Sequence, residues 1–224
     1  MNYRKLLYST FAAVMIIGAS VPLSASAEDV AANQSSTPGI TEGAINLQSV
    51  SGNTVVSDVM SFDEMVSRIS SDKGISIDQA SDLIRSNSGV TRSLSSARLA
   101  TYRTFTQQIP NSGQYFKPSV SFYCETTEGG GYGAILKILT TNLIRSYDIY
   151  TLQFSGSLYV NLENGSKIHY VLNGDWYENG VTSQTGSIGI SIGEFFTASY
   201  SVTSSNHHYR YQYAESDLTW GHVR

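Results

Sequence analysis

Apolar and polar residues alternate with a period of two over most of the chain after residue 100. In residues 152–163, the even positions are apolar or glycine and the odd positions are polar or tyrosine. Residues 167–176 repeat this alternation, and Asn164-Gly165 between the two segments is a strong signal for a tight hairpin turn. Side chains of a strand alternate between its two faces, so the pattern predicts half-buried antiparallel strands.

The same period continues on both sides of this hairpin, in residues 120–125, 188–202 and 208–213. Glu194 breaks the apolar face of residues 188–202 and Phe195 breaks the polar one, which predicts a bend or bulge. Residues 135–139 are apolar on both faces, as in a central strand. We therefore expect a mainly β fold, with an antiparallel β-sandwich or barrel over about residues 100–224.

Residues 60–88 follow helical spacing instead. Ser61 with Glu64 and Ser76 with Gln79 form two capping boxes, and Gly74 separates the two apolar stripes. The segment is predicted to be a short α-helical hairpin that precedes the β-domain, joined to it by a linker at 89–99.

The N-terminal residues 1–27 have the features of a signal peptide. Arg4 and Lys5 precede an apolar run, and Ala25-Ser26-Ala27 supplies the small residues that a signal peptidase requires. Residues 28–59 are rich in Ser, Thr, Asn and Gly, and we expect them to be a flexible spacer, with a pro-segment as the alternative. The mature protein is therefore predicted to be secreted and extracellular, either released or loosely associated with the cell wall.

Charge and cysteine content narrow the class of protein. The formal charge is −4, and no basic patch is present, so nucleic acid is not an expected partner. The single cysteine, Cys124, excludes a disulfide framework within the chain and fits a bacterial exported protein. No run after the signal is long enough for stable membrane insertion, and the sequence does not indicate an oligomeric state.

Candidate catalytic and metal-binding residues are few. Cys124 is in phase with Val120 and Phe122 and is expected to be buried, which favours a packing role over a nucleophilic one. His207 and His208 are adjacent and would point to opposite faces of a strand, so they do not predict a metal site with His222. The acidic residues of the β-domain show no paired spacing. We therefore predict no catalytic, cofactor or metal residues.

The distribution of tyrosine is the feature of the sequence that most favours a ligand-binding function. Thirteen of the fifteen tyrosines follow residue 100, and Tyr123, Tyr159 and Tyr177 are in phase with polar residues, which predicts that their rings face solvent. Exposed tyrosine among Ser, Asn and Gly suits ligand recognition, although cross-strand packing explains the same residues. These three tyrosines are the candidate ligand-binding residues.

Three functions remain open on this basis. The first is a non-catalytic binding module for an extracellular ligand: a cell-wall polymer, a glycan or a protein. The second is a membrane-active β-protein, because residues 188–202 are apolar on one face and rich in Ser and Gly on the other. The third is an extracellular hydrolase that uses a pair of carboxylates, which requires two acidic side chains to converge in a cleft.

Overall fold

The computed structural model describes residues 53–87, 100–129, 132–186, 189–203 and 207–220. The predicted signal peptide at 1–27, residues 28–52 of the predicted spacer, the linker at 89–99 and His222 lie outside these residues. No helix in the described part of the chain is long and apolar enough to cross a membrane.

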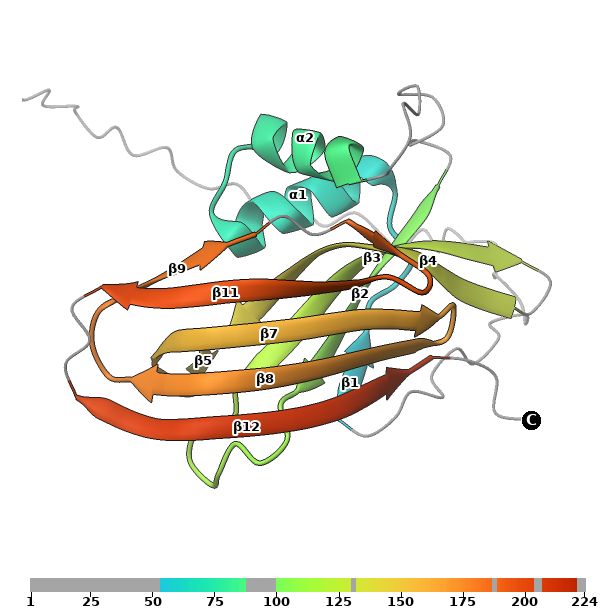
Figure 1. Cartoon of the computed structure of the whole chain (residues 1–224). Coiled ribbons are helices and arrows are strands. Elements are labelled where there is room, and N and C mark those ends of the chain that lie inside the picture. Colours follow the sequence, from blue (N-terminus) through green and yellow to red (C-terminus); the bar gives the residue numbers. More distant parts are fainter. Residues whose placement is uncertain (1–52, 88–99, 130–131, 187–188, 204–206, 221–224) are drawn as a thin grey trace, which may run out of the picture. The chain divides into compact units, whose positions relative to one another are not determined.

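Two antiparallel sheets form a sandwich that is not closed into a barrel, as the strand order shows (Figure 1). The first sheet has the order β1-β2-β3-β4-β10 and the second has the order β12-β8-β7-β11-β9. The strands of the first sheet are β1 (Thr54–Val56), β2 (Thr101–Gln108), β3 (Ser119–Gly129), β4 (Tyr132–Ile144) and β10 (Ile190–Ser191). Those of the second are β7 (Gln153–Asn164), β8 (Lys167–Tyr177), β9 (Val181–Thr185), β11 (Phe195–Thr203) and β12 (His208–Thr219). The prediction of a mainly β, sandwich-like fold is confirmed.

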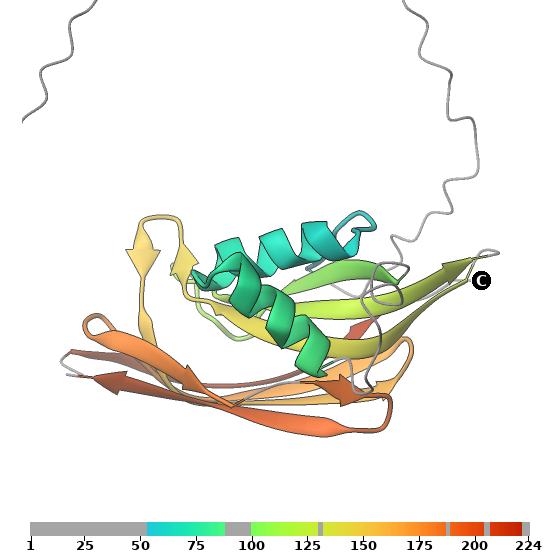
Figure 2. The ribbon, with the colours of Figure 1, turned by 90° about the horizontal axis from the view of Figure 1, so that it is seen from above.

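The helical hairpin forms a third layer on the first sheet (Figure 2). Helix α1 (Phe62–Lys73) is capped at its N-terminus by Ser61. The Ser61 hydroxyl accepts a hydrogen bond from the Glu64 amide, and the Glu64 carboxylate accepts one from the Ser61 amide. The helix ends at Gly74, which has φ of 64°. Helix α2 (Ile77–Asn87) begins with the equivalent exchange between Ser76 and Gln79. Both predicted capping boxes are present.

Two apolar clusters hold these layers together. The larger lies between the sheets and includes Phe122, Phe154, Leu158 and Trp176. The smaller joins the hairpin to the outer side of the first sheet. It contains the buried side chains Phe62, Met65, Val66, Ile69, Ala80, Ile84, Tyr102, Tyr123 and Leu139. The first sheet is therefore buried on both faces.

The chain passes between the sheets at three places: between β4 and β7, between β9 and β10, and between β10 and β11. After β4, the small hairpin of β5 (Ser146–Tyr147) and β6 (Tyr150–Thr151) leads into β7. Later, a turn with Gly193 at φ of 83° carries the chain from β10 in the first sheet to β11 in the second. The predicted bend at Glu194 is this turn. Ile192, expected on the apolar face, is 49% exposed because it lies in the turn.

The predicted spacer at 28–59 is wrong at its C-terminal end. Thr54–Val56 form β1, which pairs antiparallel with β2 and so extends the first sheet. This segment has few large apolar residues, but its backbone hydrogen bonds to β2 compensate for the small buried area.

The Asn164-Gly165 hairpin forms as predicted between β7 and β8. The connection at Asn179-Gly180, by contrast, leads from β8 to β9 at the far edge of the same sheet.

Candidate functional site

The outer side of the second sheet is the most extensive surface built from regular structure among the described residues. Both described helices lie on the first sheet, so the outward side chains of β12, β8, β7, β11 and β9 remain exposed or half-buried. We call this set of outward side chains the open face. Its register places residues of all five strands in rows, from Tyr213 through Asn173, Ser157 and Ser199 to Thr185.

The three predicted ligand-binding tyrosines do not share one environment. Tyr159 lies half-buried on the open face, and its ring packs against Phe195 at 5.7 Å between centroids. Tyr177 lies half-buried on the same face and contacts His208 at 5.6 Å. By register the two tyrosines are six residues apart along the sheet, about 20 Å at 3.3 Å per residue.

The prediction for Tyr123 is wrong. Its side chain points away from the inter-sheet core, as its phase with polar residues requires, but the helical hairpin covers that side of the first sheet. The ring is fully buried and its hydroxyl donates to the Asp72 carboxylate at 2.7 Å. Burial, with this hydrogen bond, raises the pKa of Tyr123 far above its ordinary value.

Three further aromatic residues, which were not among the predicted ligand-binding residues, lie on the open face. Tyr211 and Tyr213 on β12 are 55% and 49% exposed, and Phe195 on β11 is 68% exposed. In order along the sheet, the rings begin with Tyr177 on β8, continue with Tyr211 and Tyr213 on the edge strand β12, and then cross to Tyr159 on β7 and Phe195 on β11. Tyr211 also donates to the Asn173 side chain at 2.8 Å, which fixes its orientation.

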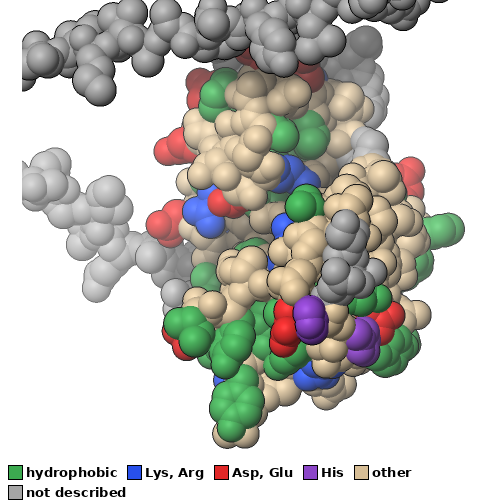
Figure 3. Space-filling view, turned by 90° about the vertical axis from the view of Figure 1, so that its left-hand side faces the viewer, with side chains coloured by type: hydrophobic (Ala, Val, Ile, Leu, Met, Phe, Trp, Pro, Cys, Tyr) green, Lys and Arg blue, Asp and Glu red, His purple; other side chains and the backbone are tan. Residues whose placement is uncertain are grey.

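One end of the open face carries histidine beside acidic groups, and Figure 3 shows these side chains gathered between hydrophobic ones. His208 Nε2 lies 2.8 Å from the Asp175 carboxylate. His207 has φ of 61° and contacts Asn179 instead, so the two adjacent histidines serve different partners. Neither histidine belongs to a possible metal site within the described residues. The one group of possible metal ligands in this part of the chain contains neither of them.

That group is at the other end of the open face. One ligand atom each from Glu163, His169 and Asp217 lies within 4.8 Å of the others. The Lys167 ammonium already sits between the two carboxylates, at 2.9 Å from each. A metal ion would have to displace this cation, so the residues present fit a lysine-centred ion-pair network better than a metal centre.

The ionisation of this network follows from its contacts. Hydrogen bonds to Glu163 and Asp217 raise the pKa of Lys167. Partial burial opposes the charge on Asp217, but hydrogen bonds from His169 and Lys167 outweigh it and lower the pKa of Asp217. The Asp217 carboxylate is therefore charged at neutral pH, and it converges with the Glu163 carboxylate on an exposed sheet surface. Acid catalysis of glycoside cleavage requires a protonated carboxyl group, which the pairing with Lys167 disfavours.

Cys124 lies in the core between the sheets, as predicted. Burial raises the pKa of its thiol well above the ordinary value, so the thiol is protonated at neutral pH. Glu194, the carboxylate predicted to interrupt an apolar face, is exposed in the β10–β11 turn, where it accepts from the Ser191 amide at 2.7 Å.

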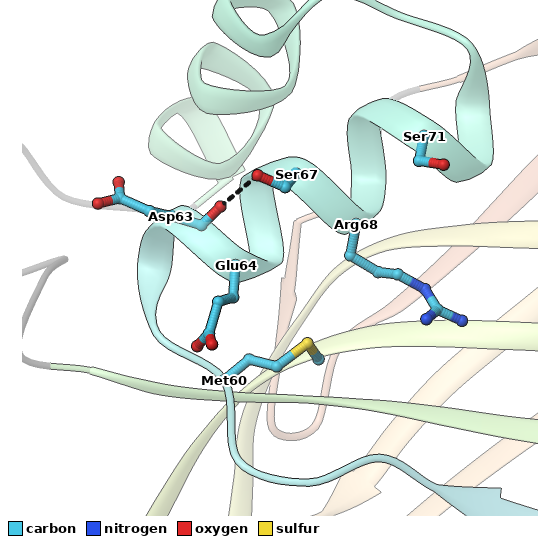
Figure 4. Close-up of a pocket in the computed structure, with 6 residues that line it drawn as sticks. All are labelled: Met60, Asp63, Glu64, Ser67, Arg68 and Ser71. Carbon is cyan, nitrogen blue, oxygen red and sulfur yellow. Dashed lines mark hydrogen bonds between the residues drawn. The ribbon is translucent and has the colours of Figure 1, made fainter. Parts of the chain in front are cut away.

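Two recesses border α1, and most of the polar side chains that line them already bond to other groups of the protein. Figure 4 shows the first, which is lined by Met60, Asp63, Glu64, Ser67, Arg68 and Ser71. Here Glu64 is held in the capping box, Ser67 donates to the carbonyl of Asp63 at 2.8 Å, and Arg68 pairs with Asp72 at 2.8 Å.

The second recess lies between the end of α1, the first sheet and the β5–β6 hairpin, and Arg68, Asp72, Asn142 and Arg145 contribute to its lining. Asp72 accepts from both Arg68 and Tyr123, and the Arg145 guanidinium donates to the Gln153 side chain. The polar groups of this recess therefore hold the layers together.

No model of a known protein family, no curated protein and no solved structure matches this chain.

Proposed function

We propose that this is an exported, non-catalytic binding protein whose open face holds an extracellular ligand. The class of ligand that best suits the open face is a polysaccharide of the cell surface. The observation that carries the proposal is the course of exposed and half-buried aromatic rings across one uncovered sheet. Export rests on the signal-like residues 1–27.

The character of the rings supports a sugar ligand. Tyrosine and phenylalanine rings on strands lose little side-chain entropy on binding, and they present flat apolar surfaces that complement the C–H faces of a sugar ring. Hydroxyl and amide groups surround them, including Ser157, Asn173 and Ser199, and these can bond to sugar hydroxyls. The length of the aromatic course favours an extended polymer over a small molecule.

The charge of the open face restricts the ligand further. Its four acidic groups, Glu163, Asp175, Glu215 and Asp217, outnumber its one lysine, Lys167. An acidic surface repels polyphosphates, which argues against nucleic acid and strongly anionic polymers. A neutral or amino-bearing polysaccharide is the expected partner.

Binding to purified cell-wall polysaccharides and to a glycan array tests the proposal. The double variant Tyr159→Ala, Phe195→Ala removes one ring-on-ring pair from the open face. We expect its affinity to fall about tenfold, which corresponds to the loss of about 1.4 kcal/mol of aromatic contact with the ligand. Tyr132→Ala is the matched control, because Tyr132 is 79% exposed but lies on the first sheet.

Absence of binding to every cell-wall fraction and glycan would overturn the proposal. Equal affinities for the double variant and the Tyr132→Ala control would also overturn it, because binding would then not depend on the open face. Circular dichroism and thermal unfolding of each variant establish that the sheets remain intact.

The two other functions predicted from the sequence have less support. In residues 189–203 the apolar side chains of Ile190, Ala198 and Tyr200 are buried in the sandwich core, so the core accounts for the pattern that suggested membrane activity. Liposome leakage is the test for that alternative. For a hydrolase, the carboxylates that converge are Glu163 and Asp217, and Lys167 neutralises them.

A further inference from the structure

The small hairpin of β5 and β6 carries apolar side chains that belong to neither buried cluster. Tyr147 pairs with Tyr150 across the hairpin, so Asp148 and Ile149 form the two-residue turn at its tip. Every residue from 146 to 151 is exposed. Ile149 is 83% exposed, the highest value among the large apolar side chains of the described residues. Packing within the fold therefore does not account for an isoleucine at this turn.

The hairpin projects from one end of the sandwich. It lies in the connection between β4 and β7, and among the described strands β5 and β6 pair only with each other. Figure 2 shows that the turn of this hairpin is directed away from the second sheet, on the side where the helices lie. The turn and the open face therefore point to different sides of the molecule.

The exposed apolar side chains of the hairpin form a cluster, which we call the hairpin patch: Tyr147, Ile149 and Tyr150. The Lys117 ammonium lies 5.9 Å from the centre of the Tyr147 ring, so the loop between β2 and β3 borders this patch. In the same loop, Tyr115 is 66% exposed. Figure 3 faces this end of the molecule and shows hydrophobic side chains gathered toward its lower left. Single apolar side chains are normal on a protein surface, whereas a cluster indicates an interaction site.

The size and shape of the hairpin patch narrow the class of partner. A standard interface between two proteins buries about 800 Å² on each partner and needs matching shapes. Three side chains at a projecting turn fall well short of that area. A lipid bilayer, by contrast, needs no matching shape and binds in proportion to the apolar area that enters it. A lipid surface is therefore the partner that the patch fits best.

The residue types along the hairpin match the layers of a bilayer surface. Ile149, at the turn, is purely aliphatic and suits the boundary with the acyl chains. Tyr147 and Tyr150 flank the turn, and tyrosine rings favour the headgroup level because one end of the ring is apolar and the other is polar. The long side chain of Lys117 beside Tyr147 can extend its ammonium to lipid phosphates.

Asp148 is the residue of the turn that opposes entry into a bilayer. Its φ of 54° explains its presence, because aspartate is one of the few residues other than glycine that adopt left-handed backbone readily. Lys117 and Asp148 carry opposite charges, so attraction to the patch does not depend on anionic lipids. We therefore expect shallow insertion, with Asp148 among the hydrated headgroups.

We propose that the β5–β6 hairpin docks this protein on a bilayer of zwitterionic phospholipid, with Ile149 at the boundary between headgroups and acyl chains. The protein then lies on the membrane surface and does not span it. A single myristoyl chain gives only marginal membrane binding, so we expect three side chains to bind weakly and reversibly. The proposal is independent of the proposed function, because it uses no residue of the open face and leaves that face uncovered (Figure 2).

Co-sedimentation of the purified protein with phosphatidylcholine vesicles tests the proposal. We expect the bound fraction to rise with lipid concentration, and Ile149→Ser should lower the partition coefficient about tenfold because an aliphatic side chain no longer leaves water. Ile192→Ser is the matched control, since Ile192 is also exposed in a turn, between β10 and β11, away from the hairpin. This control should bind as the wild type does. Circular dichroism establishes that each variant is folded.

The variant Ile149→Trp gives a second measurement on the same residue. Tryptophan favours the membrane interface, so this variant should bind at least as well as the wild type. Its fluorescence should shift to shorter wavelength when vesicles are added. Trp176 and Trp220 are buried, so the wild type should show no comparable shift.

Failure of the wild type to bind phosphatidylcholine vesicles, or equal binding by Ile149→Ser, would overturn the proposal. Binding only to vesicles that contain phosphatidylglycerol would also overturn it, because charge and not the hairpin patch would then drive the contact. If a second copy of the chain covers the patch instead, sedimentation velocity should show association that Ile149→Ser abolishes, and no vesicle binding. None of these results bears on polysaccharide binding, which Ile149→Ser should leave unchanged.

Discussion

The two sheets of the sandwich differ in what lies on their outer sides. On the first sheet, the helical hairpin covers Tyr123, which is fully buried. On the second sheet, no described helix covers Tyr159, which remains half-buried among polar side chains. Both tyrosines have the same phase in the sequence, opposite to the core between the sheets. The alternation therefore predicts the face of the strand on which a side chain lies. Whether that face is exposed to solvent depends on whether a third layer covers it.

The largest difference between the two sheets is expected on truncation of these tyrosines. Tyr123→Ala removes a buried ring from the cluster between hairpin and sheet, and we expect the free energy of unfolding to fall by about 3–5 kcal/mol. Tyr159→Ala should cost about 1 kcal/mol or less, because much of its ring remains in water. Urea unfolding measures both.

Tyr123→Phe serves as the control for this comparison. It keeps the ring but loses the hydrogen bond to Asp72, and it should cost about 1 kcal/mol. Similar losses for Tyr123→Ala and Tyr159→Ala would mean that the hairpin contributes little to the stability of the first sheet.

The buried tyrosines should together make the stability of the fold decrease at alkaline pH. Burial raises the pKa of Tyr170 to about 12 and shifts those of Tyr123 and Tyr200 higher still, whereas an unfolded chain ionises each near 10. The unfolded state therefore holds fewer protons above pH 10. Stability is unaffected below that pH and should fall as the pH rises further, by about 1 kcal/mol per tyrosine for each pH unit.

Chemical denaturation between neutral pH and pH 11 measures this loss. The Tyr123→Phe variant should lose stability less steeply than the wild type, because one of the three groups is removed. Tyr132→Phe is the matched control on an exposed tyrosine and should leave the slope unchanged. A slope that is the same in all three proteins would contradict the assignment.

The smallest effect is expected in the ion-pair network on the open face. Because its pKa is lowered, Asp217 stabilises the fold above the pKa of an unfolded aspartate, near 4, and this contribution is lost as the pH falls through the lowered value. Asp217→Asn should cost only a few tenths of a kcal/mol at neutral pH, since the network is largely exposed.

Thermal unfolding at neutral pH and at pH 3 checks this expectation. The difference in stability between the wild type and Asp217→Asn should shrink at the lower pH. A difference that grows toward acid would mean that Asp217 is not paired in the folded protein.

Local rules in the sequence predicted most of the fold. The capping boxes at Ser61 and Ser76 and the turn at Asn164-Gly165 depend on hydrogen bonds between residues close in the chain, and all three form as predicted. The strand at Thr54–Val56 was missed because its stability comes from pairing with β2, about fifty residues away. Backbone pairing of this kind leaves no compositional signal.

The candidate site was only partly predictable for the same reason. Tyr159 and Tyr177 were placed correctly on the solvent-facing side of their strands, and Phe195 was placed on the polar side of residues 188–202, but Tyr211 and Tyr213 were not assigned to a face. In the first half of β12, tyrosine alternates with histidine, arginine and glutamine, so neither set of positions is clearly the apolar one. The convergence of Glu163, His169 and Asp217 also depends on three strands being neighbours, which spacing along the chain does not reveal.

The segment from Ile190 to Thr203 belongs to both sheets, since it pairs with β4 before the turn at Gly193 and with β7 after it. The two layers are thus tied by a covalent hinge along the side where β10 and β11 lie (Figure 1). On the opposite side, the described contacts between the layers are made by side chains, such as the ring of Trp220, just after β12, against Phe105 of β2 at 5.1 Å. Any partial separation of the layers must pivot about the hinge, so the amide hydrogens of β12 should exchange with deuterium sooner than those of β7 and β11.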